Sequence, residues 1–442
     1  MPNVSVSDFG AKGDGRSDDS AAIQKAVDAC AASGGGRVVL PSGRVFVCGP
    51  VQLRSNIELH LEHASRLKAI PGRSLYTQET MAILGGDGRK WLHADRADNI
   101  AITGGGTIDG SGVAFMKEEL PAIFRTDADR PFMLHLEACR RISLRDVTFE
   151  DAPFWTVHLA GCEDVAIDGI RILDNVKIAN SDGIDIHRCR NVRVSGCTII
   201  AGDDGICLKS ERGYEALGDC EDIVVTGCTI RSTSCAIKIG SGTAGAIRRV
   251  VVSGCSVFAS HRGLGIQARD QGLVEDVLFS DITVQTRYEA ACWWGDATPI
   301  YVTAMRREEG AALGCVRDVR FSNIRCRGEN GVLIASEGPE HLHDVELEDV
   351  AVAIQPSAGR AAGRYDFRPC AARPAVIEGP TDGFHILRAA GVTLRKCSVA
   401  WPEPPQAYHR HAVYSHDAPK LCVEGLTGSS AFPDRLPPVM LA

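Results

Sequence analysis

Three aspartates stand at a spacing that could serve acid–base chemistry. Asp182 lies in the stretch NSDG, and Asp203 and Asp204 lie side by side in GDDG, roughly twenty residues later. Carboxyl groups that share a site repel one another when ionised, so proximity or burial raises the pKa of at least one of them. A protonated donor then stands beside ionised acceptors, which is the division of roles that hydrolysis of a glycosidic bond requires.

The three aspartates also have simpler interpretations. Asp and Asn favour turns, and both NSDG and GDDG look like turn sequences, so the three acids could be turn formers only. Clustered acids can also bind calcium, although this spacing lacks the pattern of a calcium-binding loop. These alternatives remain open at the level of the residues alone, and we predict no metal site and no cofactor.

Composition narrows the classes of partner. The chain has 442 residues, 44% of them hydrophobic, and a net charge of −8 with both signs interspersed. It has no basic stripe for a nucleic-acid backbone or an anionic membrane surface, so neither partner is expected. The expected partner is an oligosaccharide or polysaccharide substrate. Oligomeric state cannot be deduced.

The cysteines favour a reducing environment. There are 17 of them without the compact spacing of a disulfide framework. Cys197, Cys228 and Cys255 stand in near-identical SGC or TGC contexts, which predicts stacked core thiols. The first residues show no basic start followed by an apolar run, and no segment is apolar enough to span a bilayer. We therefore expect a cytoplasmic protein, or a secreted one if a leader was removed.

The elements that must position the acids come from an internal repeat. Segments such as RNVRVSGCTI and EDIVVTGCTI share a polar pair, a branched apolar residue, alternation with period 2 and a tight Gly, Asp or Asn turn. Period 2 with many Val, Ile and Thr residues predicts strands rather than helices. The first branched residues of the eight repeats are Ile142, Val165, Val192, Ile223, Val250, Val277, Val319 and Val345.

Repeats this short can bury an apolar face only by stacking, so the predicted fold is an all-β parallel β-helix forming one domain over 1–442. Residues 1–40 form an N-terminal cap and first strand. Stacked coils follow over 41–355, with a long loop at 286–312, and residues 356–442 form an irregular segment and a last coil. The chain makes nearly one full turn of the solenoid between Asp182 and Asp203, so the acids lie on neighbouring coils. Their carboxylates are therefore expected within about 4 to 10 Å of one another.

One helix is predicted at the N-terminal end of the solenoid, where exposed strand edges need a cover. Acidic and hydroxyl residues at 17–20 offer an N-cap, and glycines at 34–36 end the helix. The apolar face consists of Ile23, Ala26, Val27 and Cys30.

The stretch 180–210 resembles the core signature of the polygalacturonases, glycoside hydrolase family 28. NSD at 180–182 is similar to the family's Asn-Thr-Asp, and GDDGICLKS at 202–210 is similar to its Gly-Asp-Asp element. The stretches DFGAKGDGRSDDSAAIQKAVDAC and GGRVVLPSGRVF resemble the opening of many pectin-active β-helices. The resemblance implies a right-handed parallel β-helix that hydrolyses pectic glycosides with inversion. It implies Asp203 as general acid, with Asp182 and Asp204 positioning and deprotonating water.

Two family elements are missing. Cys235, in SCAIKIGS, stands where the family has the histidine of Gly-His-Gly, and GIQ at 265–267 stands where it has Arg-Ile-Lys. That cationic pair holds the carboxylate of galacturonate, and Gly with Gln cannot replace it. Either the sugar is neutral or other cations have taken over. The available cations are Lys209, Lys238, Arg262, Arg269 and Arg287.

Further candidates for substrate contact have structural alternatives. His261 could be a displaced histidine or a polar turn residue, and His158 could reach the cleft or pack in its strand. Trp293, Trp294 and Asp296 lie in the long loop, where paired tryptophans could stack on sugar rings or plug the solenoid.

Three functions are consistent with these residues. The preferred one is an inverting glycoside hydrolase on a pectic or related oligosaccharide, outside the strict polygalacturonases. A β-helix polysaccharide lyase or epimerase would need a basic residue beside the acids, for which Lys209 is the candidate. A non-catalytic carbohydrate-binding solenoid would use the acids as turn formers.

Overall fold

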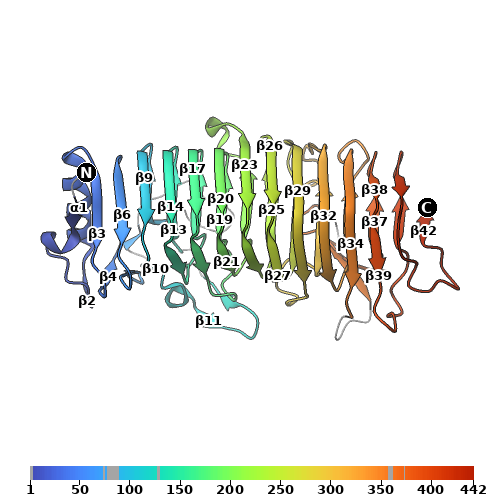
Figure 1. Ribbon diagram of the computed structural model, residues 1–442, viewed down its shortest axis with the longest axis horizontal. Coiled ribbons are helices and arrows are strands. Elements are labelled where there is room, and N and C mark those ends of the chain that lie inside the picture. The colour runs from blue at the N-terminus through green and yellow to red at the C-terminus, as the bar shows by residue number, and fades with distance from the viewer. Residues whose placement is uncertain (1–2, 73–74, 77–88, 127–129, 357–361, 373) are drawn as a thin grey trace. The chain divides into compact units, whose positions relative to one another are not determined.

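The structure is a computed structural model that describes residues 3–72, 75–76, 89–126, 130–356, 362–372 and 374–442. Its backbone contacts divide the chain into two compact units. Unit 1 comprises Met1–Ile206 and Ala216–Gly218, and unit 2 comprises Cys207–Glu215 and Asp219–Ala442. Within each unit, strands of successive coils lie side by side (Figure 1). The predicted all-β parallel β-helix is confirmed.

Unit 1 consists of three rows of parallel strands. Each full coil contributes one strand to each row. The first row is β5 (Val51–Gln52), β8 (Lys90–Asp95), β13 (Phe132–Glu137), β16 (Val157–Ala160) and β19 (Ile184–His187). The second is β1 (Asn3–Ser5), β3 (Gly36–Leu40), β6 (Ile57–Leu61), β9 (Asp98–Thr103), β14 (Arg140–Arg145), β17 (Glu163–Asp168) and β20 (Arg190–Ser195). The third is β2 (Asp14–Asp18), β4 (Val45–Cys48), β7 (Arg66–Ala69), β10 (Thr107–Asp109), β15 (Thr148–Glu150), β18 (Arg171–Leu173) and β21 (Thr198–Ala201).

Unit 2 also consists of rows of parallel strands, and its longest strand is β29 (Leu273–Thr286). Its first row is β22 (Ile206–Ser210), β25 (Cys235–Thr243), β28 (Arg262–Ala268), β30 (Thr298–Ala304), β33 (Val332–Ser336), β37 (Phe384–Leu387), β40 (Val413–His416) and β42 (Val439–Leu441). The remaining parallel strands are β23 (Cys220–Thr226), β24 (Thr229–Ser232), β26 (Ile247–Ser253), β27 (Ser256–Ser260), β29 (Leu273–Thr286), β31 (Cys315–Val316), β32 (Val319–Gly328), β34 (Val345–Ile354), β38 (Thr393–Arg395), β39 (Ser398–Ala400) and β41 (Cys422–Glu424).

The strand register follows the sequence repeat. In unit 1, Ile142 pairs with Val165, and Val165 pairs with Val192. In unit 2 the pairs run in order through Ile223, Val250, Val277, Val319 and Val345. All of these side chains are buried, so the branched position of each repeat forms one continuous apolar row within each unit.

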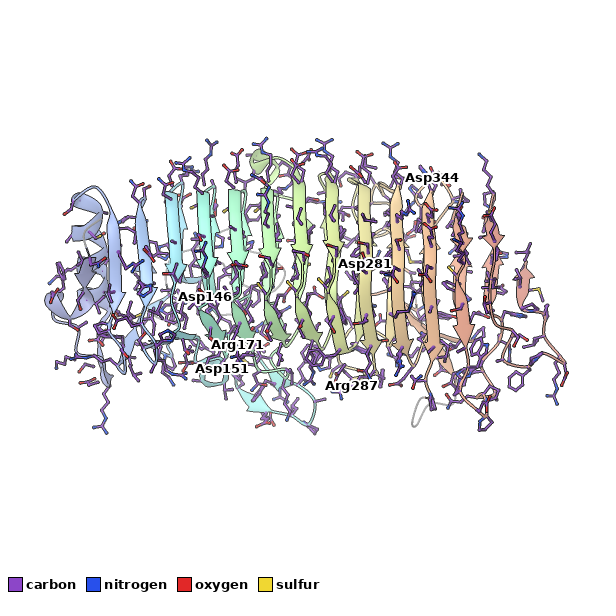
Figure 2. All side chains as sticks on the ribbon, in the orientation of Figure 1. Asp146, Asp151, Arg171, Asp281, Arg287 and Asp344 are labelled. Atoms are coloured by element: carbon purple, nitrogen blue, oxygen red, sulfur yellow. The ribbon has the colours of Figure 1, made fainter. Side chains whose placement is uncertain are left out.

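The polar pairs of the repeat have a backbone reason. The second residue of each pair has a positive φ, for example 58° at Asp164 and 53° at Asp276. The tight turn after each strand uses the same conformation, with φ of 63° at Asp146 and 57° at Asp281, both labelled in Figure 2. Asp, Asn and Gly tolerate this left-handed region better than branched residues, which explains their recurrence.

The predicted N-terminal helix is confirmed as α1 (Ser20–Ala32). It buries Ile23, Ala26, Val27 and Cys30, the face expected from the sequence, and it contacts β1, β3, β5 and β6. Asp19 precedes the helix and accepts hydrogen bonds from the amides of Lys12 and Gly13. The helix therefore covers the first strands of unit 1.

Most of the cysteines are core residues, whereas Cys292 is exposed and Cys315 and Cys422 are half-buried. All 17 lie in the described part of the chain, and none forms a disulfide. Cys197, Cys228 and Cys255 are buried, and each thiol donates to the carbonyl two residues earlier. Among the described residues, no cluster of His, Cys, Asp and Glu side chains could hold a metal ion. Nor does this part of the chain contain a helix long and apolar enough to cross a membrane.

Two regions differ in detail from the expected organisation. The loop expected over 286–312 is interrupted by β30, because TPIYVTA alternates and buries its apolar residues in the coil. The irregular segment after residue 356 contains an antiparallel hairpin, β35 (Gly363–Asp366) with β36 (Val376–Gly379). One coil was expected near GVTLRKCSV, and the structure adds β40, β41 and β42 after it. Short antiparallel pieces also occur in unit 1, as β11 (Glu118–Glu119) with β12 (Phe124–Arg125).

Candidate active site

The three aspartates lie on successive coils of unit 1, at the edge where first-row strands begin. The amide of Thr156 donates to the carbonyl of Asp182 at 2.9 Å, and the amide of Gly183 donates to the carbonyl of Asp204 at 2.9 Å. This step-by-step hydrogen bonding places Asp182 and Asp204 at equivalent positions of neighbouring coils, which are about 4.8 Å apart in such sheets. Asp182 and Asp204 are buried and Asp203 is half-buried.

Glycines allow the acid-bearing turns to pack this closely. A Cβ atom at Gly183 would stand 2.5 Å from the carbonyl oxygen of Gly205. One at Gly202 would stand 2.4 Å from the carbonyl oxygen of Asn175 and 2.4 Å from the Ser181 hydroxyl. Both contacts are shorter than real Cβ atoms permit, so the glycines of NSDG and GDDG are required by packing beyond their turn preference.

Asp203 is held by the turn before Asp182. Its Oδ2 accepts a hydrogen bond of 3.0 Å from the amide of Asn180, which has a positive φ of 59°. Asn180 in turn accepts at its Oδ1 a 3.0 Å hydrogen bond from Arg130, a buried residue before β13. No sequence motif marks Arg130, because it lies 50 residues before Asn180 and only the fold brings the two together.

A fourth carboxyl group supports the same edge. Asp174 is buried and accepts hydrogen bonds from the Ala152 amide (2.8 Å) and the Thr156 hydroxyl (2.6 Å). Burial raises the pKa of Asp174 to about 7, against the lowering effect of these two donors. Thr156 is the residue whose amide contacts the Asp182 carbonyl, so Asp174 stabilises the neighbour of an acid-bearing turn.

His158 packs within the sheet face of unit 1. It is fully buried, its Nδ1 lies 2.9 Å from Nδ1 of His135, and its ring contacts Trp155 and Phe132. Of the two interpretations of His158, the structure therefore favours packing in the strand. Burial also lowers the pKa of His135, and it lowers the pKa of His93 on the preceding coil to about 4, so these two imidazoles are neutral near pH 7.

In unit 2, the two candidate lysines interact with the same carboxyl group. Lys209 and Lys238 are both buried, and both interact electrostatically with Glu211. Burial raises the pKa of Glu211, while the charges of Lys209, Arg307 and Lys238 oppose that rise. The lysines thus belong to a charged cluster whose other members the sequence did not indicate.

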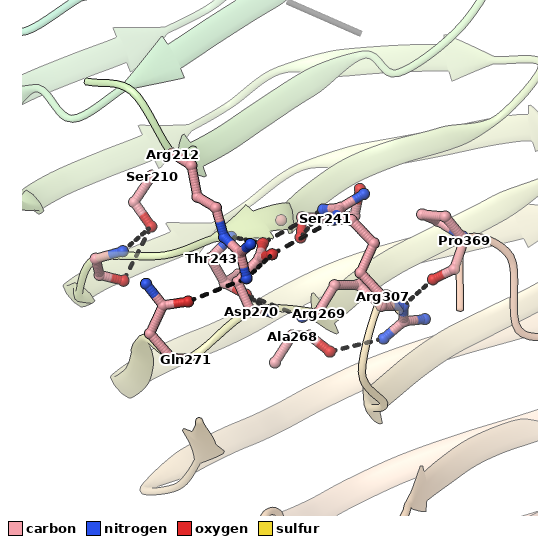
Figure 3. Close-up of polar contacts among 12 residues, drawn as sticks. Ser210, Arg212, Ser241, Thr243, Ala268, Arg269, Asp270, Gln271, Arg307 and Pro369 are labelled. Carbon is pink, nitrogen blue, oxygen red and sulfur yellow. Dashed lines mark hydrogen bonds and ion pairs between the residues drawn. The ribbon is translucent and has the colours of Figure 1, made fainter. Parts of the chain in front are cut away.

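Asp270 is the second acid of that cluster (Figure 3). Its Oδ2 accepts a 2.9 Å hydrogen bond from the Thr243 amide and lies 3.3 Å from Nη2 of Arg307. The same Arg307 nitrogen donates to the Ser241 carbonyl at 2.8 Å, and Arg212 lies 3.5 Å from the other carboxylate oxygen. Asp270 therefore joins the ends of β25 and β28 to the segment after β30.

The other candidate cations of unit 2 differ in their surroundings. Arg262 is buried, lies 4.3 Å above the Tyr301 ring and donates to the Asp366 carbonyl. Arg269 is fully buried and donates to four backbone carbonyls, including those of Pro369 and Phe367. These two arginines fasten the β35–β36 hairpin to the sheet. Arg287 lies at the periphery of unit 2 with its side chain half-exposed, 3.0 Å from Glu289 (Figure 2).

The long loop meets the hairpin in unit 2. The amide of Gly295 donates to Asp366 at 2.8 Å, and Arg368 donates to both carboxylate oxygens of Asp366 at 2.9 and 2.7 Å. Burial would raise the pKa of Asp366, but the hydrogen bonds and charges of Arg368 and Arg262 outweigh it and lower that pKa.

The two tryptophans of the loop differ in how far they are exposed to solvent. Trp293 is buried, whereas Trp294 is 40% exposed with the Arg368 guanidinium 6.0 Å from its ring. His261 is buried with its ring 5.3 Å from that of Tyr288, and Asp296 is buried with Arg364 at 3.5 Å. Trp294 is the more exposed of the two tryptophans, and its contact with sugar stays a prediction.

Comparison with known proteins identifies the family. The model for glycosyl hydrolases family 28 matches residues 30–358. The chain belongs to this family. It is 29% identical over 211 residues to a probable polygalacturonase of Arabidopsis thaliana and 27% identical over 304 residues to one of Vitis vinifera. These alignments cover 47% and 64% of this chain but only 42% and 61% of the relatives, so the chain spans about half of their length.

A solved structure extends the similarity. The exopolygalacturonase of Thermotoga maritima superimposes with a TM-score of 0.69 and 26% sequence identity, covering 80% of this chain and 87% of that one. The family resemblance drawn from NSD and GDDG is thereby confirmed.

The two departures of this family 28 chain from the family pattern are packed against each other. A Cβ atom at Gly265 would stand 2.7 Å from Sγ of Cys235, so the thiol at the expected histidine position occupies the space that a side chain at the expected arginine position would need. Gln267, at the expected lysine position, is fully buried, and its amide makes no hydrogen bond within the described part of the chain.

The buried Asp174 predicts a pH-dependent difference between wild type and Asp174→Asn. The pKa of Asp174 is raised from 3.8 to about 7 in the folded state, so the folded protein favours the neutral carboxyl group. The stability that this group contributes is fully present below pH 4 and is lost as the pH rises through 7. Asparagine cannot ionise and can still bond Ala152 and Thr156. The variant should therefore gain thermal stability relative to wild type between pH 4 and pH 8, by an order of a few kcal/mol. A constant difference measured by calorimetry across that range would contradict the assignment.

The contact between Gly265 and Cys235 predicts non-additive stability. Gly265→Ala should lower the free energy of unfolding by about 1 to 3 kcal/mol, because the added methyl group collides with a buried sulfur. In a Cys235→Ala background the same substitution should cost less, with a coupling of at least about 0.5 kcal/mol. Denaturant unfolding of the two single variants and the double variant measures this, and strictly additive effects would show that the two positions do not share the space.

Proposed function

We propose that this chain is an inverting glycoside hydrolase that acts on a pectic or related oligosaccharide. The observation that carries the proposal is the arrangement of Asp182 and Asp204 at equivalent positions of neighbouring coils, with Asp203 beside them and more exposed. A turn-forming role alone does not require three acids at one edge of consecutive coils. Inverting hydrolysis does require several carboxyl groups around one bond and a water molecule.

The roles follow from the resemblance and are compatible with the contacts. Asp203 would protonate the leaving oxygen. Its Oδ2 accepts a hydrogen bond from the Asn180 amide, which holds the carboxyl group at this edge. Asp182 and Asp204 would hold and deprotonate water on the opposite face of the sugar. Both are more buried than Asp203, which suits groups that act on water rather than on the leaving group.

Support for a pectic substrate comes from the relatives. The curated ones named above are described as polygalacturonases, and the Thermotoga maritima protein is described as an exopolygalacturonase. A sugar polymer with galacturonate-containing chains is therefore the first substrate class to test.

The proposal excludes a strict polygalacturonase. The usual cationic pair is replaced by Gly265 and Gln267, and Cys235 fills the space beside Gly265. A carboxylate needs charge-assisted hydrogen bonds that a glycine and a neutral amide do not supply. The sugar at this position would be neutral.

Asp203→Asn tests the catalytic assignment. It should lower kcat on the best pectic oligosaccharide by roughly 100- to 10,000-fold, because the general acid is lost while the Asn180 contact can remain. Asp146→Asn, at an exposed turn of the same unit, is the matched control and should leave kcat unchanged. Proton NMR of the first product should show the anomer opposite to the substrate. Undiminished turnover by Asp203→Asn, or retention of configuration, would refute the mechanism.

Because the usual cationic pair is absent, we expect that a carboxylate on the sugar does not raise kcat/KM. On matched oligosaccharides, the kcat/KM for a carboxyl-reduced substrate should equal or exceed that for the galacturonate form. Chromatography of reducing products gives both values, and absorbance of unsaturated sugar in the near ultraviolet monitors a lyase reaction. A kcat/KM at least about tenfold higher for the charged substrate, equivalent to 1.4 kcal/mol, would mean that other cations bind the carboxylate.

A further inference from the structure

Arg130 is a buried cation that contacts the acid-bearing edge of unit 1. It is 3% exposed and precedes β13. Its Nη1 donates to the carbonyl of Pro153 at 3.0 Å and also to the carbonyl of Ala179, and its Nη2 donates to Oδ1 of Asn180 at 3.0 Å. The guanidinium carbon lies 4.9 Å from the centre of the Phe154 ring. One planar group thus joins two coils of unit 1.

These contacts lead directly to the acids. Ala179 and Asn180 form the turn that precedes Asp182, and the Asn180 amide donates to Oδ2 of Asp203 at 3.0 Å. Arg130 therefore fixes the position of Asn180, which contacts Asp203 and precedes Asp182 by two residues. A guanidinium with its donors in a rigid fork is suited to this task, whereas a lysine could make only part of the pattern.

The charge of Arg130 acts on the same groups. Burial lowers the pKa of Arg130 to about 10, and Asp203 and Asp182 act in the opposite direction. A buried cation is costly unless opposite charges compensate it. Because electrostatic attraction is mutual, the guanidinium also offsets part of the repulsion between these two aspartates.

We propose that Arg130 is a positioning residue for the three aspartates: it anchors the Ala179–Asn180 turn to the Pro153 coil and so aligns Asp203 and Asp182. It acts through Asn180 and through its charge, without contacting the reacting atoms. The catalytic part of this proposal rests on the hydrolase function proposed above, whereas the positional and electrostatic parts do not.

The competing explanation is that Arg130 only satisfies buried carbonyls. Arg188 is a matched control for that role, since it is also 3% exposed, lies in unit 1 and donates to the Gly218 carbonyl at 2.5 Å. Arg188→Lys and Arg130→Lys both keep a positive charge and lose the rigid fork. A merely structural role predicts similar effects for the two variants.

The kinetic test compares these variants on the best substrate of the wild-type protein. Arg130→Lys should lower kcat by about 100-fold, the effect of displacing catalytic groups by about 1 Å, while KM changes less than threefold. Arg188→Lys should keep kcat within threefold of wild type even if both variants lose similar thermal stability. Equal kcat values for the two lysine variants would overturn the positioning role.

A second measurement needs no turnover. The full-length protein carrying ¹³C at aspartate carboxyl groups is titrated by NMR as wild type, Arg130→Lys and Arg130→Met, with Asp203→Asn and Asp182→Asn for assignment. The titration midpoints of Asp203 and Asp182 should rise in Arg130→Met, which lacks the charge, and move less in Arg130→Lys. Unchanged midpoints in a folded Arg130→Met protein would overturn the electrostatic part. If Arg130→Met does not fold, the lysine comparison decides.

If the wild-type protein hydrolyses no oligosaccharide, the function proposed above fails, and the titration still decides whether Arg130 sets the charge of the two aspartates. If the wild type is active and only the Arg130 effects are absent, the hydrolase function stands and this inference fails.

Discussion

The hydrogen-bonded stacking of one coil on the next is the constraint from which the other features follow. It aligns the branched apolar residues of each unit into rows, as in the pairs Ile142–Val165 and Val250–Val277. The same spacing brings Asp182 and Asp204 to equivalent positions at the edge of consecutive coils. A one-residue change of register in a strand would turn its apolar side chains outward, so core packing and the placement of the acids are specified together.

Concentrating acids at such an edge has an electrostatic cost that the neighbouring residues offset in different ways. Asp203 receives a backbone amide from Asn180, and the buried Arg130 supplies a positive charge near Asp203 and Asp182. Asp174 has donors but no cation among the causes of its shift, and its pKa rises to about 7. Burial therefore outweighs two hydrogen-bond donors at Asp174, so a carboxyl group at this edge can hold a proton near neutral pH.

Local periodicity was enough to predict the strands, the apolar rows, α1 and the neighbouring positions of the aspartates, because a solenoid converts sequence spacing directly into spatial order. Contacts made over long separations could not be predicted in this way. Arg130 reaches Asn180 across 50 residues, and Arg262 reaches Asp366 across 104. The packing of Cys235 against Gly265 was also hidden, since the sequence showed two separate departures from the family pattern but not that they share one space.

The central claim is that the three aspartates converge on one bond of a sugar chain. The most direct test is a crystal structure of the Asp203→Asn variant with a bound pectic oligosaccharide. We expect a glycosidic oxygen within about 2.6 to 3.2 Å of the side chain at position 203, and an ordered water between Asp182 and Asp204 on the opposite face of the sugar. An oligosaccharide bound on another face of the coils, with no sugar near these residues, would contradict it.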